Sequence, residues 1–576
     1  MLPKKAWFPQ PRHYHKGGFL REIPAGLTVG ILLVPQAMAY ALLAGVDPIY
    51  GLYASLIPLL IYSLLSSSPQ VSVGPTALAS LVTLGVLSGM PEIPAADYPL
   101  MAFTLAGLTG VFQLLFGILR LGILVTLLSR PVISGFVSAA AILIMLSQIK
   151  TLFGLDMPRT TYLFDSIRAI GENLNSFHWP TAIMSLGSLV FLLVSRRLIK
   201  GWGTLLLIVL ATIVTAIFNL DQSGLAVVGE LSAGLPSFSW PVFDLDTIKM
   251  LIPGALILAM LSFVETVSIA KTYEEQHAYY RAQPNRELIA LGLSKVIGSI
   301  FQSIPTSGSF SRSAVAHRQG ATTFRTHLIT VVIVILALFL ITDLFFYLPL
   351  PALSVIIVLS VEKLLNLAEI RRLWRLDRRD WLNLMATLLV TLIGGLQLGI
   401  ATGVLLSLGF VLLRNTRPHL AELGRLAGTS EFRNRLRFEE LEIDPAVLIV
   451  RFDAELYFGN ADYFRTEVEQ LIQGRGDLLQ AVIIDAQTIN DLDSTGAYVL
   501  EQLHEQLQQD QVALYFCGAI GPVRDHLHRF GLMHKLGLDR HFLTVQQALD
   551  HFQAAPDEKG DLDQSALQHK YGSTDL

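Results

Sequence analysis

Long apolar runs without a charged residue dominate the first 417 positions of the chain. These uncharged runs occupy residues 23–46, 48–91, 98–119, 173–195, 201–220 and 381–413. A helix needs roughly 20 apolar residues to cross the hydrocarbon core of a bilayer. The pattern therefore predicts a polytopic α-helical membrane protein.

Proline, glycine and charged residues divide these runs into fourteen predicted helices, of which the third and the tenth are too short to cross a bilayer alone. The predicted helices occupy residues 23–45, 50–66, 75–89, 98–119, 129–148, 178–195, 203–219, 252–271, 287–301, 309–317, 324–342, 348–362, 380–395 and 398–414.

The charges between these helices predict the orientation, because Lys and Arg collect on the cytoplasmic side. With the N-terminus inside, the inner loops hold seventeen of them: Arg120, Arg130, Arg196, Arg197, Lys200, Arg281, Arg286, Arg318, Arg325, Lys363, Arg371, Arg372, Arg375, Arg378, Arg379, Arg414 and Arg417. The outer loops hold only Lys150, Arg159, Arg168 and Lys249. We expect a multi-pass protein of the plasma (inner) membrane with both termini in the cytoplasm.

The composition changes after Arg417, where charges return at soluble density. Short apolar runs at 447–452, 481–484 and 513–517 predict buried strands, and amphipathic stretches at 461–473, 495–508 and 522–530 predict helices. Alternation of strands and helices indicates a small α/β domain. We expect a cytoplasmic N-terminal segment (1–22), a transmembrane domain (23–417), a linker (418–435), an α/β domain (436–555) and a disordered tail (556–576).

Overall composition narrows the function classes further. Charged residues make up 15% of the chain, against about 25% in a soluble domain. The single cysteine, Cys517, excludes an intramolecular disulfide and a cysteine-based metal cluster. The sequence has no block of basic residues that would indicate nucleic-acid binding, and it has no GxxxxGK[ST] loop that would indicate nucleotide binding. We expect no enzyme activity, no metal and no cofactor, so that an ion gradient would drive any transport.

Two motifs recur seven predicted helices apart. IPAG (23–26) opens the first helix and IPGA (252–255) opens the eighth, and Gln36 and Glu265 each lie twelve residues beyond the motif's proline. Two helices further on, VSVGPTALAS (71–80) matches IPTSGSFSRS (304–313). Each helix crosses the membrane once, so an offset of an odd number of helices between the two copies of a motif gives the second half the opposite orientation in the membrane. The chain is therefore predicted to be a pair of inverted repeats with a site near the membrane midplane.

The second pair of motifs places Gly, Pro, Ser and Thr at membrane depth, which is tolerated where backbone lines a cavity or is buried in protein. Two half-helices that begin there aim their free amides and positive dipole ends at one point, which attracts an anion. The alternative is that these residues kink closely packed spans. The matched positions in both halves favour a binding site.

Glu265 lies in an otherwise uncharged run, 250–270. A carboxylate inside a membrane is costly, so it indicates a proton carrier or a cation ligand. A structural carboxylate bound to Ser or Thr neighbours, or a helix boundary misplaced by one turn, would also account for it.

Arg312 lies in the SFSR run, where its guanidinium can pair bidentately with an oxyanion. It could instead extend to the cytoplasm together with Arg318. If Glu265 and Arg312 approach each other, the arginine keeps the carboxylate ionised until an anion competes for it, which would couple proton and anion.

Other polar residues are weaker candidates for the same site. Gln36 and Tyr40 share one helix face and could donate to an oxyanion, although ordinary helix packing also explains them. Thr76, Ser309, Phe310 and Ser311 have the same status. Lys295 is expected at a lipid interface or facing a loop rather than in transport.

Several of these stretches resemble a known family. VPQAMAYALLAGVDPIYGLYAS (34–55) followed by SVGPTALAS (72–80) resembles the opening signature of the sulfate permease (SulP) family of anion transporters. SFVETVSIAK (262–271) and the run 285–315 are similar to the family's eighth to tenth spans, and NDLDSTGAYVL (490–500) resembles part of its C-terminal STAS domain.

The resemblance implies seven plus seven inverted helices in core and gate subdomains, an elevator-type movement and a homodimer. It implies substrate binding by Gln36, Tyr40, Thr76, Ser309, Phe310, Ser311 and Arg312, with Glu265 for proton or cation coupling. Bicarbonate carriers of the family place a sodium-binding Asp at the position of Glu265 and generally lack the SFSR run. In soluble STAS relatives a loop hydroxyl is phosphorylated, here Thr495 with Ser494 beside it, but Asp493 or Ser494 is equally suited to cap a helix.

The sequence therefore predicts secondary active transport of a small inorganic oxyanion. The favoured substrate is sulfate, carried together with protons. A sodium-coupled bicarbonate or dicarboxylate carrier is one alternative, and a regulatory membrane protein that binds an anion without carrying it is another. A nucleobase carrier fits less well, because Arg312 suits an anion. The STAS domain is expected to control assembly or activity, with room for a cytoplasmic partner.

Overall fold

The computed structural model describes residues 22–90, 94–123, 129–158, 162–198, 203–230, 234–242, 244–276, 281–340 and 343–554. The chain forms two compact units, Met1–Ser407 and Leu408–Leu576. The tail expected at 556–576, and the N-terminal segment apart from Glu22, lie outside the described residues.

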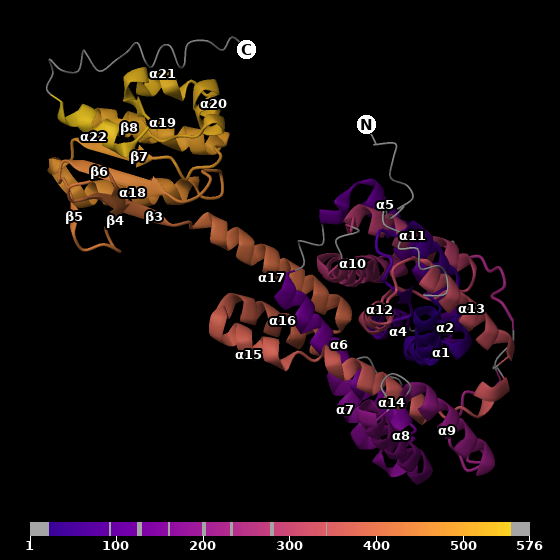
Figure 1. Cartoon of the computed structure of the whole chain (residues 1–576). Coiled ribbons are helices and arrows are strands. Elements are labelled where there is room, and N and C mark those ends of the chain that lie inside the picture. Colours follow the sequence, from indigo (N-terminus) through magenta and orange to yellow (C-terminus); the bar gives the residue numbers. More distant parts are fainter. Residues whose placement is uncertain are drawn as a thin grey trace. The chain divides into compact units, whose positions relative to one another are not determined.

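Helices build the first unit, and they form two bundles (Figure 1). The first bundle contains α1 (Ile23–Ala44), α2 (Pro48–Tyr53), α3 (Ile57–Leu65), α4 (Ala77–Ser88), α5 (Tyr98–Ile118), α10 (Leu245–Gln276), α11 (Pro284–Ile300), α12 (Phe310–Arg318) and α13 (Arg325–Leu340). The second contains α6 (Arg130–Phe153), α7 (Leu163–Glu172), α8 (Trp179–Leu198), α9 (Gly203–Ile217), α14 (Leu350–Val361), α15 (Leu367–Leu376) and α16 (Arg378–Gly394). Helix α17 (Leu396–Thr416) continues into the second unit.

Many of these helices are long and apolar enough to span a membrane. Six stretches of the described chain are at least 18 residues long with mean hydropathy between 1.6 and 2.1, and five shorter apolar helices accompany them. The protein is a polytopic membrane protein, as predicted. The helix expected at 50–66 is interrupted before Pro58, which lacks the N–H that a continuous helix requires, so that α2 ends at Tyr53 and α3 begins at Ile57. Helices α7 and α15 were not predicted.

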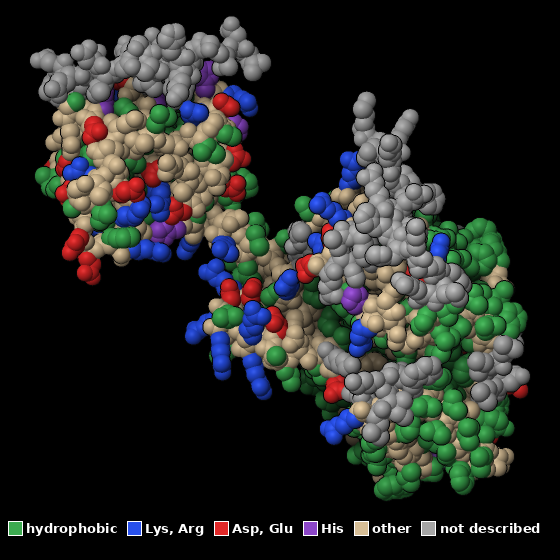
Figure 2. Space-filling view, in the orientation of Figure 1, with side chains coloured by type: hydrophobic (Ala, Val, Ile, Leu, Met, Phe, Trp, Pro, Cys, Tyr) green, Lys and Arg blue, Asp and Glu red, His purple; other side chains and the backbone are tan. Residues whose placement is uncertain are grey.

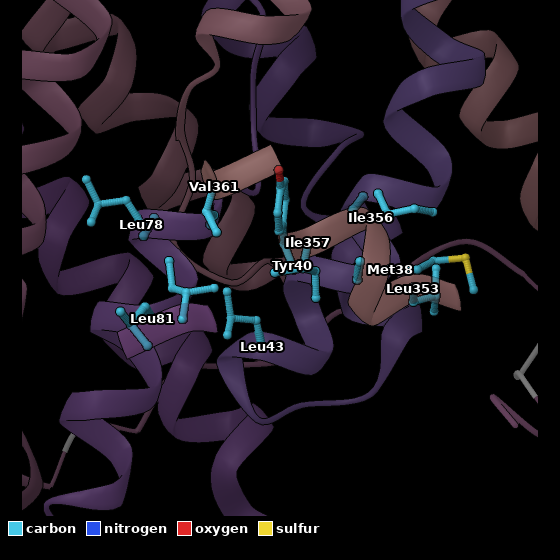
Figure 3. Close-up of a cluster of buried hydrophobic side chains, with 14 of the residues drawn as sticks. Met38, Tyr40, Leu43, Leu78, Leu81, Leu353, Ile356, Ile357 and Val361 are labelled. Carbon is cyan, nitrogen blue, oxygen red and sulfur yellow. The ribbon is translucent and has the colours of Figure 1, made fainter. Parts of the chain in front are cut away.

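Apolar side chains fill the interface between the two bundles, where α1 and α4 meet α14 (Figure 3). The residues labelled there are Met38, Tyr40 and Leu43 of α1, Leu78 and Leu81 of α4, and Leu353, Ile356, Ile357 and Val361 of α14. Among the described residues, this interface is therefore built largely from apolar contacts.

Two short strands cross inside the first bundle. Strand β1 (Val73–Gly74) precedes α4, and β2 (Ser307–Gly308) precedes α12. They pair antiparallel, with Val73 opposite Gly308 and Gly74 opposite Ser307. This pairing places the starts of two helices that are 233 residues apart in sequence next to each other.

The second unit is a seven-stranded sheet covered by helices on both faces. Its strands are β3 (Leu420–Leu426), β4 (Phe432–Asn434), β5 (Leu441–Glu442), β6 (Val447–Phe452), β7 (Ala481–Asp485), β8 (Ala513–Cys517) and β9 (His541–Phe542). Its helices are α18 (Ala461–Arg475), α19 (Ser494–Gln509), α20 (Gly521–Arg529), α21 (Leu532–Leu536) and α22 (Val545–Gln553). Helix α22 covers one face, and α18 to α21 cover the other.

Strands β6 to β9 are parallel, and β3 pairs antiparallel with β6. The segment 418–435, expected to be a linker, instead supplies β3, which pairs with β6, and the edge strand β4. Polar residues interrupt the apolar positions of β3, and β4 has only three residues, so neither shows the apolar run of a central strand such as β6.

Histidine 541, at the start of β9, predicts a pH-dependent stability of the second unit. Burial lowers the pKa of His541 to about 4, although a hydrogen bond with the Met533 backbone opposes the shift. In the unfolded chain the same imidazole has a pKa near 6.5, so below that pH the unfolded chain binds a proton that the folded chain does not bind. The free energy of unfolding therefore falls by up to about 3 kcal/mol between about pH 6.5 and 4.

We expect His541→Gln to flatten this part of the pH profile, since the amide does not titrate. Scanning calorimetry of the purified chain in detergent measures the effect, with His534→Gln on the exposed side of α21 as the control. Equal pH slopes in the parent chain and His541→Gln would show that His541 contributes nothing.

Candidate anion-binding site

The starts of α4 and α12 form the centre of the candidate site. Thr76 caps α4 by accepting from the Ala79 amide (3.4 Å), and Ser309 caps α12 by accepting from the Arg312 amide (3.4 Å). Neither helix has an acidic residue in its first turn. Two positive helix ends are therefore left without an internal counter-charge, the condition that favours a bound anion.

Hydrogen bonds between the two crossing segments hold these helix starts together. The Ser309 amide donates to the Ser72 carbonyl (3.0 Å), and the Ser72 amide donates to the Ser313 hydroxyl (3.0 Å). The site is therefore assembled from both halves of the sequence, and the backbone fixes it before any ligand arrives.

Arg312 is buried, with 1% of its surface exposed. Its Nη1 donates to the Pro75 carbonyl (3.0 Å) and its Nε to the Ser72 hydroxyl (3.4 Å), while Nη2 has no partner among the described residues. A Cβ at Gly74 would lie 3.1 Å from Nη2, so glycine leaves the room that the guanidinium needs. The side chain is directed into the protein and does not extend to the cytoplasm.

Glu265 and Thr266 of α10 fix strand β2. The Ser307 hydroxyl donates to the Glu265 carboxylate, and the Gly308 amide donates to the Thr266 hydroxyl (3.1 Å). Glu265 is half-buried. Within the described part of the chain no ion pair within 4.0 Å joins Glu265 to Arg312, so each is held by its own neutral partners, although they interact electrostatically.

The expectation for Lys295 is wrong, because the structure buries this side chain with only 1% exposed. Its ammonium donates to Gln113 Oε1 of α5 (2.9 Å), and Gln113 donates in turn to the Ala259 carbonyl (2.9 Å) and the Ser262 hydroxyl (2.8 Å) of α10. Lys295 also interacts electrostatically with Glu265. It is a second buried cation near the site.

The remaining candidates surround the helix starts from α1 and α12. Gln36 is half-buried, and its Oε1 has no partner among the described residues. The Tyr40 hydroxyl hydrogen-bonds Ser360 and interacts electrostatically with Arg312. Phe310 is 52% exposed and Ser311 is exposed as well, so the first turn of α12 is accessible from outside the protein.

The formal charges define what the arrangement can hold. Arg312, Lys295 and ionised Glu265 sum to one positive charge, and protonation of Glu265 raises the sum to two. A monoanion balances the first state and a dianion balances the second. Buried charges favour such neutrality, because an unbalanced charge in a low-dielectric interior is expensive.

Sequence reasoning missed Ser72, Gln113, Thr266 and Ser307, and it misplaced Lys295. A signal for Lys295 was present: Leu288, Leu291 and Lys295 are spaced as one helix face, and that face is buried in α11. Ser72 and Ser307 lie within the two matched motifs at 71–80 and 304–313, although neither was singled out there, whereas Gln113 and Thr266 carry no signal beyond being polar in an apolar region.

In the second unit, Asp493 caps α19 by accepting from the Gly496 amide (2.8 Å). Ser494 and Thr495 follow as the first two residues of that helix, and both are exposed. The cap is therefore the aspartate, and both hydroxyls are open to solvent.

Comparisons of the sequence connect this geometry with known proteins. Residues 19–387 match the model of the sulfate permease family, and residues 440–548 match that of the STAS domain. Probable sulfate transporter 4.2 of Arabidopsis thaliana is 35% identical, with 92% of this chain and 80% of that protein covered. High affinity sulfate transporter 2 of Stylosanthes hamata is 31% identical, covering 93% and 84%. A probable sulfate transporter of Mycobacterium tuberculosis is 30% identical, covering 96% and 99%.

Solved structures share the fold. The murine Solute Carrier 26 family member A9 anion transporter in its inward-facing state has a TM-score of 0.89 and 24% identity, with 95% of this chain and 94% of that chain covered. The transmembrane domain of a cyanobacterium bicarbonate transporter has a TM-score of 0.58 and 20% identity, covering 69% and 98%. At these identities the likeness concerns the fold alone.

Proposed function

Because the chain belongs to the sulfate permease family of anion transporters and carries a STAS domain, we propose that it carries sulfate together with protons across the plasma membrane. The family consists of transporters rather than enzymes. Relatives that are 30 to 35% identical over nearly the whole chain bear names of sulfate transporters, which supports sulfate as the substrate.

The observation that carries the proposal is the pairing of two helix starts around Arg312. Free amides at the starts of α4 and α12 suit the oxygens of a tetrahedral oxyanion, and the unpartnered Nη2 adds a charged donor. Thr76, Ser309, Ser311, Gln36, Tyr40 and the exposed ring of Phe310 complete the proposed binding site.

The charge balance supports proton coupling. Sulfate carries two negative charges, and the three ionisable groups reach two positive charges only when Glu265 is protonated. We propose that Glu265 takes up the proton that travels with sulfate. Its hydrogen bond from Ser307 connects it to strand β2 and so to the start of α12.

The arrangement of helices supports an elevator-type movement of seven plus seven inverted spans. If α2 and α3 count as one span and α7 and α15 as none, fourteen remain, and α4 and α12 take equivalent places in the two halves. The first bundle would be the moving core and the second the gate. Their apolar interface favours sliding, since apolar contacts are non-directional and can re-form in a shifted register. A homodimer with both termini in the cytoplasm is part of this proposal.

A sodium-coupled bicarbonate carrier is the second candidate. With Glu265 ionised, the three groups balance one monoanion, and the fold matches the transmembrane domain of a bicarbonate transporter. A dicarboxylate carrier, or a receptor that binds an anion without carrying it, would use the same positive helix ends.

Flux into proteoliposomes discriminates among these functions. The purified chain is reconstituted, and uptake of labelled sulfate and labelled bicarbonate is followed while pH and sodium gradients are imposed separately. We expect an acid-outside gradient to accelerate sulfate uptake and a sodium gradient to have no effect. Sodium-driven bicarbonate uptake would favour the second candidate, and saturable binding without flux would favour the receptor.

Replacing Lys295 with methionine should weaken sulfate transport while leaving the fold intact. Methionine is similar in length and apolar, so the change removes one buried positive charge, and we expect sulfate affinity to fall about tenfold, equivalent to ~1.4 kcal/mol. Concentration dependence of sulfate uptake measures it. Lys249→Met, on the exposed start of α10, is the matched control. An unchanged affinity in Lys295→Met would remove Lys295 from the charge balance.

A further inference from the structure

Helix α15 and the start of α16 carry a concentration of positive charge on the surface of the first unit. Five arginines lie within nine residues, and all five are exposed: Arg371, Arg372, Arg375, Arg378 and Arg379. Figure 2 shows basic side chains gathered where Figure 1 places α15 and α16.

These arginines lack carboxylate partners in the part of the chain that the structure describes. None of the five forms an ion pair there, although Asp377 lies among them in sequence and Glu369 and Asp380 flank them. Asp377 is instead used as the N-cap of α16, accepting from the Arg379 amide (2.9 Å). The cluster keeps a net positive charge that is free to attract an external anion.

Large apolar side chains share this surface with the arginines. Leu367 is 60% exposed, Trp374 56% and Leu376 70%. A helix whose exposed surface carries both arginines and large apolar side chains suits the boundary between headgroups and acyl chains. Its place between two apolar helices of a membrane protein puts it at such a boundary.

A hollow of about 380 Å³ lies on this surface, lined by Ile370, Arg371, Trp374, Arg375 and Trp381. Arg371 and Arg375 are one helical turn apart and so lie on the same side of α15. The two indole rings meet edge to face, with centroids 4.5 Å apart. Positive charge and aromatic walls therefore occur together in one concave place.

We propose that this hollow binds an anionic phospholipid. The headgroup phosphate would lie between Arg371 and Arg375, and the part of the acyl chains nearest the headgroup would lie against Trp374 and Trp381. A free inorganic anion would use the arginines but gain nothing from the indoles, whereas a phospholipid matches both. Anionic lipids are concentrated in the cytoplasmic leaflet, the side on which the distribution of Lys and Arg places α15. The site is separate from the proposed sulfate site and does not depend on it.

Quenching of tryptophan fluorescence by brominated lipids tests the proposal on the full chain. The protein is reconstituted in mixtures of phosphatidylglycerol and phosphatidylcholine in which only the phosphatidylglycerol is brominated, and then in mixtures in which only the phosphatidylcholine is brominated. The two sets of quenching data give the association constant of one lipid relative to the other. We expect a preference for phosphatidylglycerol that drops about tenfold in R371Q/R375Q. Trp374→Phe should reduce the quenching itself.

R378Q/R379Q is the matched control, because it removes the same charge from the same segment but leaves the hollow intact. It should keep most of the preference. An equal loss in both double variants would mean diffuse attraction rather than a site and would overturn the proposal. So would full displacement of the lipid preference by inorganic phosphate, which would identify a free anion as the occupant. Sulfate flux, measured in parallel, reports the transport function separately.

Discussion

We expect Arg312→Ala to lower the affinity for sulfate about 10- to 100-fold, the largest effect on affinity of any single replacement in the site. A hydrogen bond from a charged donor contributes about 1.5–3 kcal/mol, and each 1.4 kcal/mol is a factor of ten. The alanine variant removes the buried positive charge whose guanidinium contacts Ser72 and Pro75 on either side of β1. Arg312→Lys should recover part of the affinity, because it restores the charge but not the planar, bidentate geometry.

Concentration dependence of labelled sulfate uptake in proteoliposomes gives this affinity. Arg318→Ala is the control on the same helix, since its exposed side chain donates only to the Ala314 carbonyl (3.2 Å) among the described partners. Thermal unfolding of each variant separates lost binding from lost structure, because Arg312 also holds the Pro75 carbonyl. A fully folded Arg312→Ala protein with parental sulfate affinity would remove Arg312 from the site.

Glu265→Gln should uncouple transport from the proton gradient. The carboxamide has the shape of the protonated acid and can still contact Ser307, but it cannot release or take up a proton. We expect sulfate accumulation driven by an acid-outside gradient to fall about tenfold or more, while exchange of sulfate for sulfate continues. The site of this variant stays in the charge state that balances a dianion.

The measurement pairs gradient-driven uptake with equilibrium exchange in the same vesicles. Glu275→Gln, exposed near the end of the same helix, should behave like the parent chain in both assays. If Glu265→Gln responds to the pH gradient as the parent does, another group carries the proton. If it loses exchange as well, Glu265 holds the site together rather than coupling it.

The sequence located the two helix starts well, because prolines, glycines and hydroxyl residues mark them directly. The predicted helices at 75–89 and 309–317 became α4 (Ala77–Ser88) and α12 (Phe310–Arg318), and the structure adds that Thr76 and Ser309 cap them. The family assignment, made from the same stretches, is confirmed. The role of these residues in binding stays a prediction.

Features that depend on tertiary contacts could not be predicted in the same way. Strands β1 and β2 have two residues each, too few to show any periodicity, and their pairing is visible only in space. Lys295 was expected at a lipid interface or facing a loop, and its hydrogen bond to Gln113 on another helix is visible only in the structure. Helix α15 was not predicted, because Arg371, Arg372 and Arg375 made its segment read as part of a charged loop.

The central claim is that an anion lies between the starts of α4 and α12. Selenate tests this claim most directly, because it has the shape and charge of sulfate. Crystals of the full chain grown with selenate give the selenium position from its anomalous scattering. The account predicts a single strong peak within about 4 Å of the Ser311 and Leu78 amides, close to Arg312 Nη2. A protein that transports selenate but places the peak elsewhere in the membrane domain would contradict it.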